Sequence, residues 1–185
     1  FPLGHLVNDW PGAALWLLAP AMALSYDLST AEVGLLLTLH GAGASLGYLP
    51  AGIIGDRISN RSAALVTTFL WVAIGYGAAA YAGGLWSLGA ALAVAGIGAA
   101  AVMIEGAPER RAQLIGIHAV GGSLAEVGAP LVAGALLTLM DWPSVLLWCV
   151  VPPAVLGGVF FVCQGQVPRS SRAKVSAKDV GGLSR

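Results

Sequence analysis

Six long stretches of this chain contain almost no charged side chains, and each is long enough to cross about 30 Å of membrane hydrocarbon as a helix. Hydrophobic residues make up 57% of the 185 residues and charged residues only 10%, with a mean hydropathy of +0.82. A water-soluble domain carries about 25% charged residues. We therefore predict an all-α membrane protein with six transmembrane helices, at roughly Leu3–Tyr26, Ala31–Ile54, Ser62–Tyr81, Trp86–Ile104, Ala112–Met140 and Pro143–Cys163.

The basic residues follow only the second, fourth and sixth of these stretches, whereas the other loops carry Asp27, Glu32 and Asp141. Cytoplasmic loops concentrate positive charge. We therefore expect both termini and the basic loops to be cytoplasmic, in what we take to be a bacterial inner membrane. The nine basic residues are Arg57, Arg61, Arg110, Arg111, Arg169, Arg172, Lys174, Lys178 and Arg185.

The chain divides by composition into a six-helix bundle over residues 1–163 and a basic segment over residues 164–185. We expect this segment to be a cytoplasmic tail or the start of a central linker. The formal net charge is zero, which argues against a nucleic-acid partner. The sequence has no metal-ligand spacing, nucleophile–base pairing or phosphate loop, so we predict no metal, no cofactor and no enzymatic activity. The expected partners are membrane lipid and a small-molecule substrate.

The loop after the second stretch contains Gly52, Asp56, Arg57 and Arg61. This pattern resembles motif A of the major facilitator superfamily, although Ser59 and Asn60 depart from it. The resemblance implies the N-terminal six-helix bundle of such a transporter. A carboxylate and a guanidinium at a cytoplasmic helix end form a charge-assisted latch that breaks when helices rearrange. The alternative is that the two arginines only anchor the topology.

The first stretch contains the run Gly4-His5-Leu6-Val7-Asn8-Asp9. A His and an Asn-Asp pair at this place resemble the fosmidomycin-resistance-like branch of the superfamily. His5 and Asp9 are four residues apart and therefore share a helix face, where they can pair. We expect His5, Asn8 and Asp9 to line a water-filled cavity. The alternative is that they lie near the cytoplasmic headgroups, where their charge costs little.

The fifth stretch carries small residues at four-residue spacing, Gly121, Ala125 and Ala129, followed by Pro130. This pattern resembles motif C of the antiporter branches, with alanine twice in place of glycine. A proline within a span kinks the helix and frees a backbone carbonyl, which suits a gating helix.

Glu126 is the carboxylate that we expect to carry a proton. It lies fifteen residues beyond Arg111, about 22 Å along a helix, and no span contains a Lys or Arg to neutralise it. Removal from water favours the protonated form of a carboxyl, so this group is suited to proton exchange. His118, eight residues earlier, is a candidate relay or substrate contact. The alternative for Glu126 is a permanently protonated carboxyl group that forms a hydrogen bond to a neighbouring helix. We interpret His40, in the second stretch, as a structural residue.

These patterns favour half of a proton-coupled secondary transporter that exports small organic or drug-like molecules by alternating access. The complete pathway would come from a missing C-terminal half or from a parallel homodimer. A second hypothesis is a non-transporting membrane scaffold or binding subunit. A third is an importer of an organic anion, which is disfavoured because no span holds an Arg or Lys.

Overall fold

A computed structural model of the chain describes residues 2–57, 61–99 and 111–163. Over these residues the fold is entirely helical, which confirms the predicted class, and each helix matches one predicted span to within a few residues where the span is described. The predicted end of the fourth span, residues 100–104, and the segment 164–185 lie outside the described residues. The helices are α1 (Pro2–Tyr26), α2 (Thr30–Arg57), α3 (Arg61–Ala80), α4 (Leu85–Ala99), α5 (Arg111–Leu137) and α6 (Trp142–Val162).

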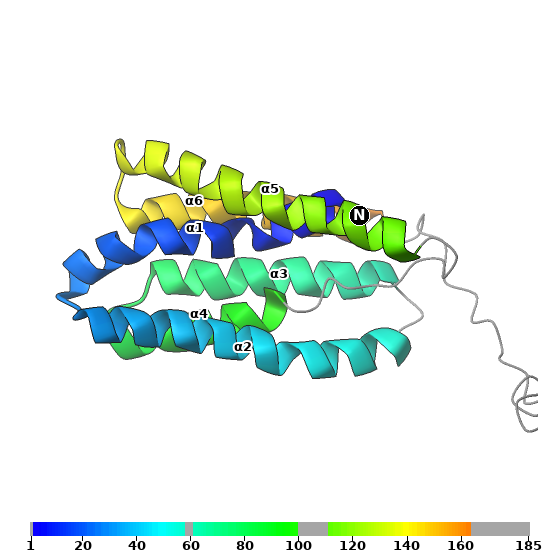
Figure 1. Cartoon of the computed structure of the whole chain (residues 1–185), viewed down its shortest axis with the longest axis horizontal. Coiled ribbons are helices and arrows are strands. Elements are labelled where there is room, and N and C mark those ends of the chain that lie inside the picture. Colours follow the sequence, from blue (N-terminus) through cyan, green and yellow to red (C-terminus); the bar gives the residue numbers. More distant parts are fainter. Residues whose placement is uncertain (1, 58–60, 100–110, 164–185) are drawn as a thin grey trace, which may run out of the picture.

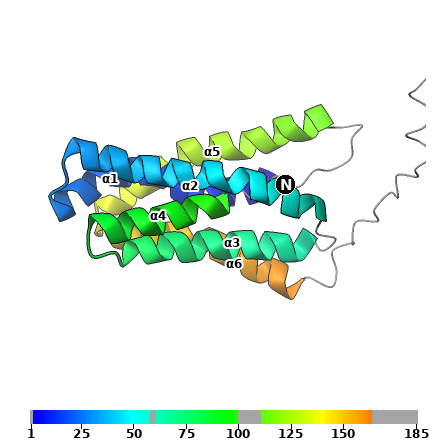
Figure 2. The same ribbon diagram turned by 90° about the horizontal axis from the view of Figure 1, so that it is seen from below.

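The helices form one elongated bundle in which α1 packs chiefly against α5 and α6 (Figure 1). The second three helices repeat the packing of the first three, because α4 packs against α2 and α3 as α1 packs against α5 and α6. Internal repeats of this kind are common in transporter folds. Figure 2 shows α2 and α5 toward one side of the bundle and α3 and α6 toward the other.

Three of the helices contain segments that are long and apolar enough to cross a membrane by length and composition, Ser62–Ala80, Ala119–Leu137 and Trp142–Val162. The apolar part of α4 is shorter, Leu85–Gly98. The hydropathy of α1 and α2 is lowered by strongly polar side chains, Asn8 and Asp9 in α1 and His40 in α2. Polar groups inside membrane helices usually face the bundle interior or an aqueous cavity, so these residues indicate where the site lies.

Local polar contacts set the helix ends opposite to the N-terminus. After α1, Asp27 adopts a left-handed backbone conformation with φ of 52°, which ends the helix. The Ser29 backbone N–H donates to the Glu32 carboxylate at 2.8 Å, and the Glu32 N–H donates to the Ser29 hydroxyl at 3.3 Å. This is a capping box for α2. Asp141 caps α6 by accepting from the Ser144 N–H, and hydrogen bonds from Ser144 hold the pKa of Asp141 below its ordinary value.

Aromatic side chains hold the same end of the bundle together. The Tyr26 hydroxyl donates to the backbone carbonyl of Ala82 in the α3–α4 turn. The indole N–H of Trp142 donates to the Ser25 hydroxyl at 2.9 Å, and the Tyr26 and Trp142 rings meet edge to face. These contacts tie the end of α1 to α6 and to the α3–α4 turn, although the residues concerned are far apart in sequence.

Glycine lets α2 and α4 approach each other backbone to backbone. A Cβ atom on Gly43 would lie 2.1 Å from the Ala93 carbonyl oxygen, and one on Gly96 would lie 2.2 Å from the His40 carbonyl oxygen. Both glycines are buried, as is Gly47, which lies one turn beyond Gly43. Small residues at such contacts allow close packing in lipid, where the hydrophobic effect does not drive helices together.

We expect Gly43→Ala to lower the free energy of unfolding by about 1–3 kcal/mol, because the new methyl group overlaps the backbone of α4. Gly41→Ala is the matched control on the same helix, since nothing lies within 4 Å of its added Cβ. The measurement is reversible unfolding of the purified protein in mixed micelles. Equal stability of the two variants would contradict the backbone contact.

Candidate functional site

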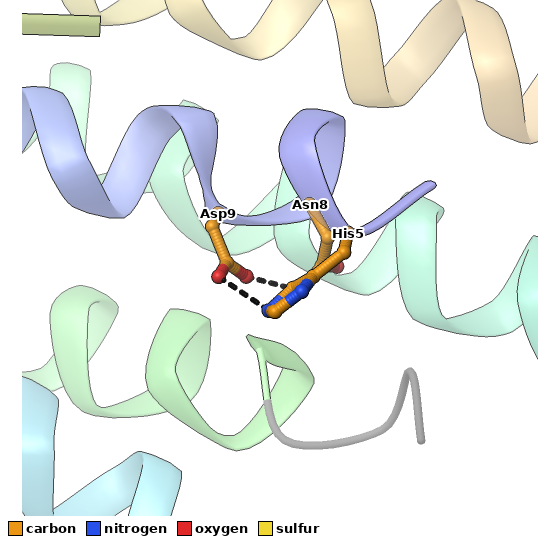
Figure 3. A network of polar contacts seen from close by, with 3 residues as sticks. All are labelled: His5, Asn8 and Asp9. Atoms are coloured by element: carbon orange, nitrogen blue, oxygen red, sulfur yellow. Dashed lines mark hydrogen bonds and ion pairs between the residues drawn. The ribbon is translucent and has the colours of Figure 1, made fainter. Parts of the chain in front are cut away.

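His5, Asn8 and Asp9 form a polar cluster on α1, and Figure 3 shows both dashed interactions ending on Asp9. The Nε2 atom of His5 lies 2.8 Å from Oδ2 of Asp9, and the Asn8 side-chain amide donates to Oδ1 of Asp9 at 3.3 Å. The side chains of His5 and Asp9 are 22% and 32% exposed, whereas Asn8 is buried. The pairing expected from the four-residue spacing is therefore present, with Asn8 holding the second carboxylate oxygen.

Two glycine contacts fix the register between the α1 and α5 helices. A Cβ atom on Gly122 would lie 2.9 Å from Cε1 of His5, and one on Gly128 would lie 3.2 Å from the Trp10 ring. Because both helices advance in the same direction through these contacts, Glu126 lies one turn beyond Gly122 just as Asp9 lies one turn beyond His5. The two carboxylates therefore lie at the same level on neighbouring helices.

Glu126 is exposed on the bundle surface, where among the described residues it makes no hydrogen bond or ion pair. The exposed surface of α5 has two stripes at helical spacing. One is large and apolar, which suits contact with lipid, and the other is small or polar and contains Glu126. The apolar stripe consists of Val120, Leu124, Val127 and Leu131, and the other of Ala119, Ser123 and Glu126 with the partly buried Pro130.

The position of Glu126 along α5 gives the level of the polar cluster along the bundle axis. It lies fifteen residues after Arg111 and eleven before Leu137, about 22 Å and 16 Å from the two ends of the helix. Asp9 shares this level through the α1–α5 register. Asp9 and Glu126 therefore lie at one level, near the middle of the length of α5. The position of this level in the membrane stays a prediction.

The other sequence-predicted residues have different settings. Gly121, Ala125 and Ala129 are buried on the face of α5 that packs against α1, and Pro130 follows them within a continuous helix. Gly52, Asp56 and Arg57 belong to α2, Arg61 begins α3 and His118 belongs to α5. The side chains of these five residues lie outside the described part of the structure.

A second polar pair, which sequence reasoning missed, lies beside the cluster. The Nε2 atom of His40 on α2 lies 2.6 Å from the hydroxyl of Tyr76 on α3, and Tyr76 is buried. Both side chains lie against Gly12 of α1, where an added Cβ would be 2.7 Å from the Tyr76 hydroxyl oxygen and 3.8 Å from the His40 ring. Asp9 lies one turn before Gly12 on α1. No local sequence pattern predicts this contact, because it joins residues from three different helices.

We expect Gly122→Ala to displace the His5 imidazole, because its new methyl group would lie 2.9 Å from Cε1 of the ring. The displacement should lengthen the His5–Asp9 contact, shift the imidazole ¹⁵N resonance of His5 and cost about 1 kcal/mol of stability through the strained rotamer. Gly116→Ala on the same helix is the control, because nothing lies within 4 Å of its Cβ. An unchanged His5 resonance in Gly122→Ala would contradict the register.

Comparisons with known proteins agree with this architecture. The model of the Major Facilitator Superfamily matches residues 3–183. The chain is 32% identical over 151 residues to the probable 4-methylmuconolactone transporter of Cupriavidus pinatubonensis (strain JMP 134 / LMG 1197), a match that covers 75% of the chain and 35% of that protein. Its fold is similar, with a TM-score of 0.69 and 17% identity, to the proton:xylose symporter XylE bound to 6-bromo-6-deoxy-D-glucose. That match covers 91% of this chain and 43% of the symporter, so the chain spans less than half the length of both proteins.

Proposed function

Because the chain belongs to the major facilitator superfamily, we propose that it is the N-terminal half of a secondary transporter in which side chains of α1 and α5 carry a coupling proton. The family and the apolar helices identify an integral membrane protein, and they point to transport and not to catalysis. Cytoplasmic loops concentrate positive charge, so the distribution of the basic residues supports cytoplasmic termini in a bacterial inner membrane as part of this proposal.

What supports this proposal is that Asp9, paired with His5, and Glu126 lie at the same level on the neighbouring helices α1 and α5. Ionisable groups within membrane spans are costly in lipid and are retained where they meet an aqueous pathway. Asp9 is held by His5 and Asn8, whereas Glu126 has no partner among the described residues. Glu126 is therefore the proton carrier in this proposal, and the α1 cluster orients the substrate beside it.

The transported molecule is a small oxygen-containing organic compound in this proposal. The relative with 32% identity is named as a probable transporter of a lactone, and we choose 4-methylmuconolactone as the probe. The likeness of Gly121, Ala125, Ala129 and Pro130 to the antiporter motif favours export.

A second six-helix unit completes the pathway in this proposal. The chain covers 35% and 43% of the lengths of the two transporters to which it is similar. The α2 and α5 helices lie toward the same side of the bundle (Figure 2), and this is the side that meets the second unit in this proposal. The unit is a C-terminal half or a parallel copy of the same chain, because the halves of this family are related by an axis along the membrane normal.

We expect Glu126→Gln to abolish proton movement driven by a 4-methylmuconolactone gradient in proteoliposomes that contain the chain together with its second six-helix unit, because the amide cannot exchange a proton. Folding should be preserved, since Glu126 is exposed and makes no described contact. The measurement is the pH inside the vesicles, and Glu32→Gln, which removes a carboxylate at the end of α2, is the control.

Undiminished proton movement in Glu126→Gln would remove the proposed role of this residue. Absence of any solute or proton movement in the wild-type protein, together with a stable complex with another membrane protein, would instead support a non-transporting scaffold. Proton movement in the same direction as the lactone would instead indicate an importer of the symporter type. That result would contradict proton-driven export.

A further inference from the structure

The His40–Tyr76 pair has features that a purely structural contact does not require. Tyr76 is 1% exposed, and its hydroxyl needs a hydrogen-bond partner, which Nε2 of His40 provides at 2.6 Å. The partner itself is only half-buried. The other ring nitrogen of His40, Nδ1, has no hydrogen-bond partner among the described residues and is not among their buried polar atoms. A polar atom of His40 thus remains accessible beside the bundle interior.

Gly12 makes the space in which this pair lies. Its Cβ position would be 2.7 Å from the Tyr76 hydroxyl oxygen, so any side chain at this place would displace the pair. Gly12 is three residues beyond Asp9 and therefore on a neighbouring part of the same helix face. We call the partly exposed edge of His40, where its ring meets Gly12 and Tyr76, the Gly12 notch.

We propose that the Gly12 notch binds a hydroxyl or carbonyl oxygen of the transported molecule, with His40 as a specificity-determining residue and Tyr76 as the residue that positions it. This inference rests on the proposed function. It adds to it the place where an uncharged oxygen of the substrate binds. The Tyr76 hydroxyl fixes the orientation of the His40 ring, and the accessible Nδ1 edge meets the substrate oxygen. The His5–Asp9 pair lies about one turn away along α1.

The arrangement explains why a polar pair is retained between α2 and α3 at the level of the site. An imidazole offers one donor and one acceptor when neutral, so it can bind the tyrosine hydroxyl and a substrate oxygen at once. A site built to hydrogen-bond an oxygen strongly rejects an analogue that lacks it, because the polar groups of the site are then left unpaired. The notch therefore selects for oxygen-containing molecules and against hydrocarbons of the same shape.

The test measures 4-methylmuconolactone binding to the whole chain in lipid nanodiscs by calorimetry. We expect His40→Leu to weaken binding about five- to tenfold through loss of one hydrogen bond, and His40→Gln to restore it to within about twofold. Tyr76→Phe should weaken binding less, because only the orientation of the ring is lost. Thr38→Ala, which removes an exposed hydroxyl bonded only within α2, is the control and should bind as the wild type does.

A second measurement tests whether position 40 is accessible and lies near the bound lactone, and it does not require transport. In a Cys149→Ser and Cys163→Ser background, His40→Cys should react with a water-soluble thiol reagent, and the lactone should slow that reaction. In flux experiments, His40→Leu should raise KM and leave the maximal rate unchanged.

If His40→Leu leaves lactone binding unchanged, the Gly12 notch does not bind the substrate. The proposed transport function would still stand. An unreactive His40→Cys, or a reactive one that the lactone does not protect, would also contradict binding at the notch. Absence of lactone-driven proton movement in the wild-type protein, even where lactone binding depends on His40, would instead contradict the proposed function.

Discussion

Close contact between helix backbones is the constraint on which the rest of this structure depends. In lipid, burial of apolar surface does not draw helices together, so dispersion contacts and small interfacial residues must hold the bundle. Here α2 meets α4 at Gly43 and Gly96, and α1 meets α5 at Gly122 and Gly128. At these positions the partner's backbone or side chain occupies the space that a side chain would need. The glycines therefore determine the register of the helices as well as their separation.

The register in turn creates the polar site. Because Gly122 lies against His5 and Gly128 against Trp10, Asp9 and Glu126 share one level in the bundle. Gly12 acts in the same way one turn further along α1, where it admits the His40–Tyr76 pair. His5 and Asp9, and likewise His40 and Tyr76, thereby gain a polar partner within the bundle. A larger residue at Gly12 or Gly122 would disturb these polar contacts directly.

The sequence was sufficient for the helices and for contacts within a helix, but not for contacts between helices. Apolar length and the placement of basic residues predicted six helices, and the spacing of His5 and Asp9 predicted their pairing, which the structure contains. The level that Asp9 shares with Glu126 required the α1–α5 register, which no local pattern encodes. His40 was interpreted as structural because its partner, Tyr76, lies 36 residues away and meets it only across Gly12. The gate predicted at Asp56 and Arg57 stays a prediction.

Cysteine cross-linking between α1 and α5 in native membranes tests the shared level of Asp9 and Glu126 most directly. In a chain without Cys149 and Cys163, Asp9→Cys combined with Glu126→Cys should be joined by a linker of roughly 10 Å, the usual spacing of packed helices. Asp9→Cys combined with Leu131→Cys, on the apolar stripe, should not be joined. Cross-linking of position 9 to position 131 and not to position 126 would contradict the register and, with it, the proposed proton site.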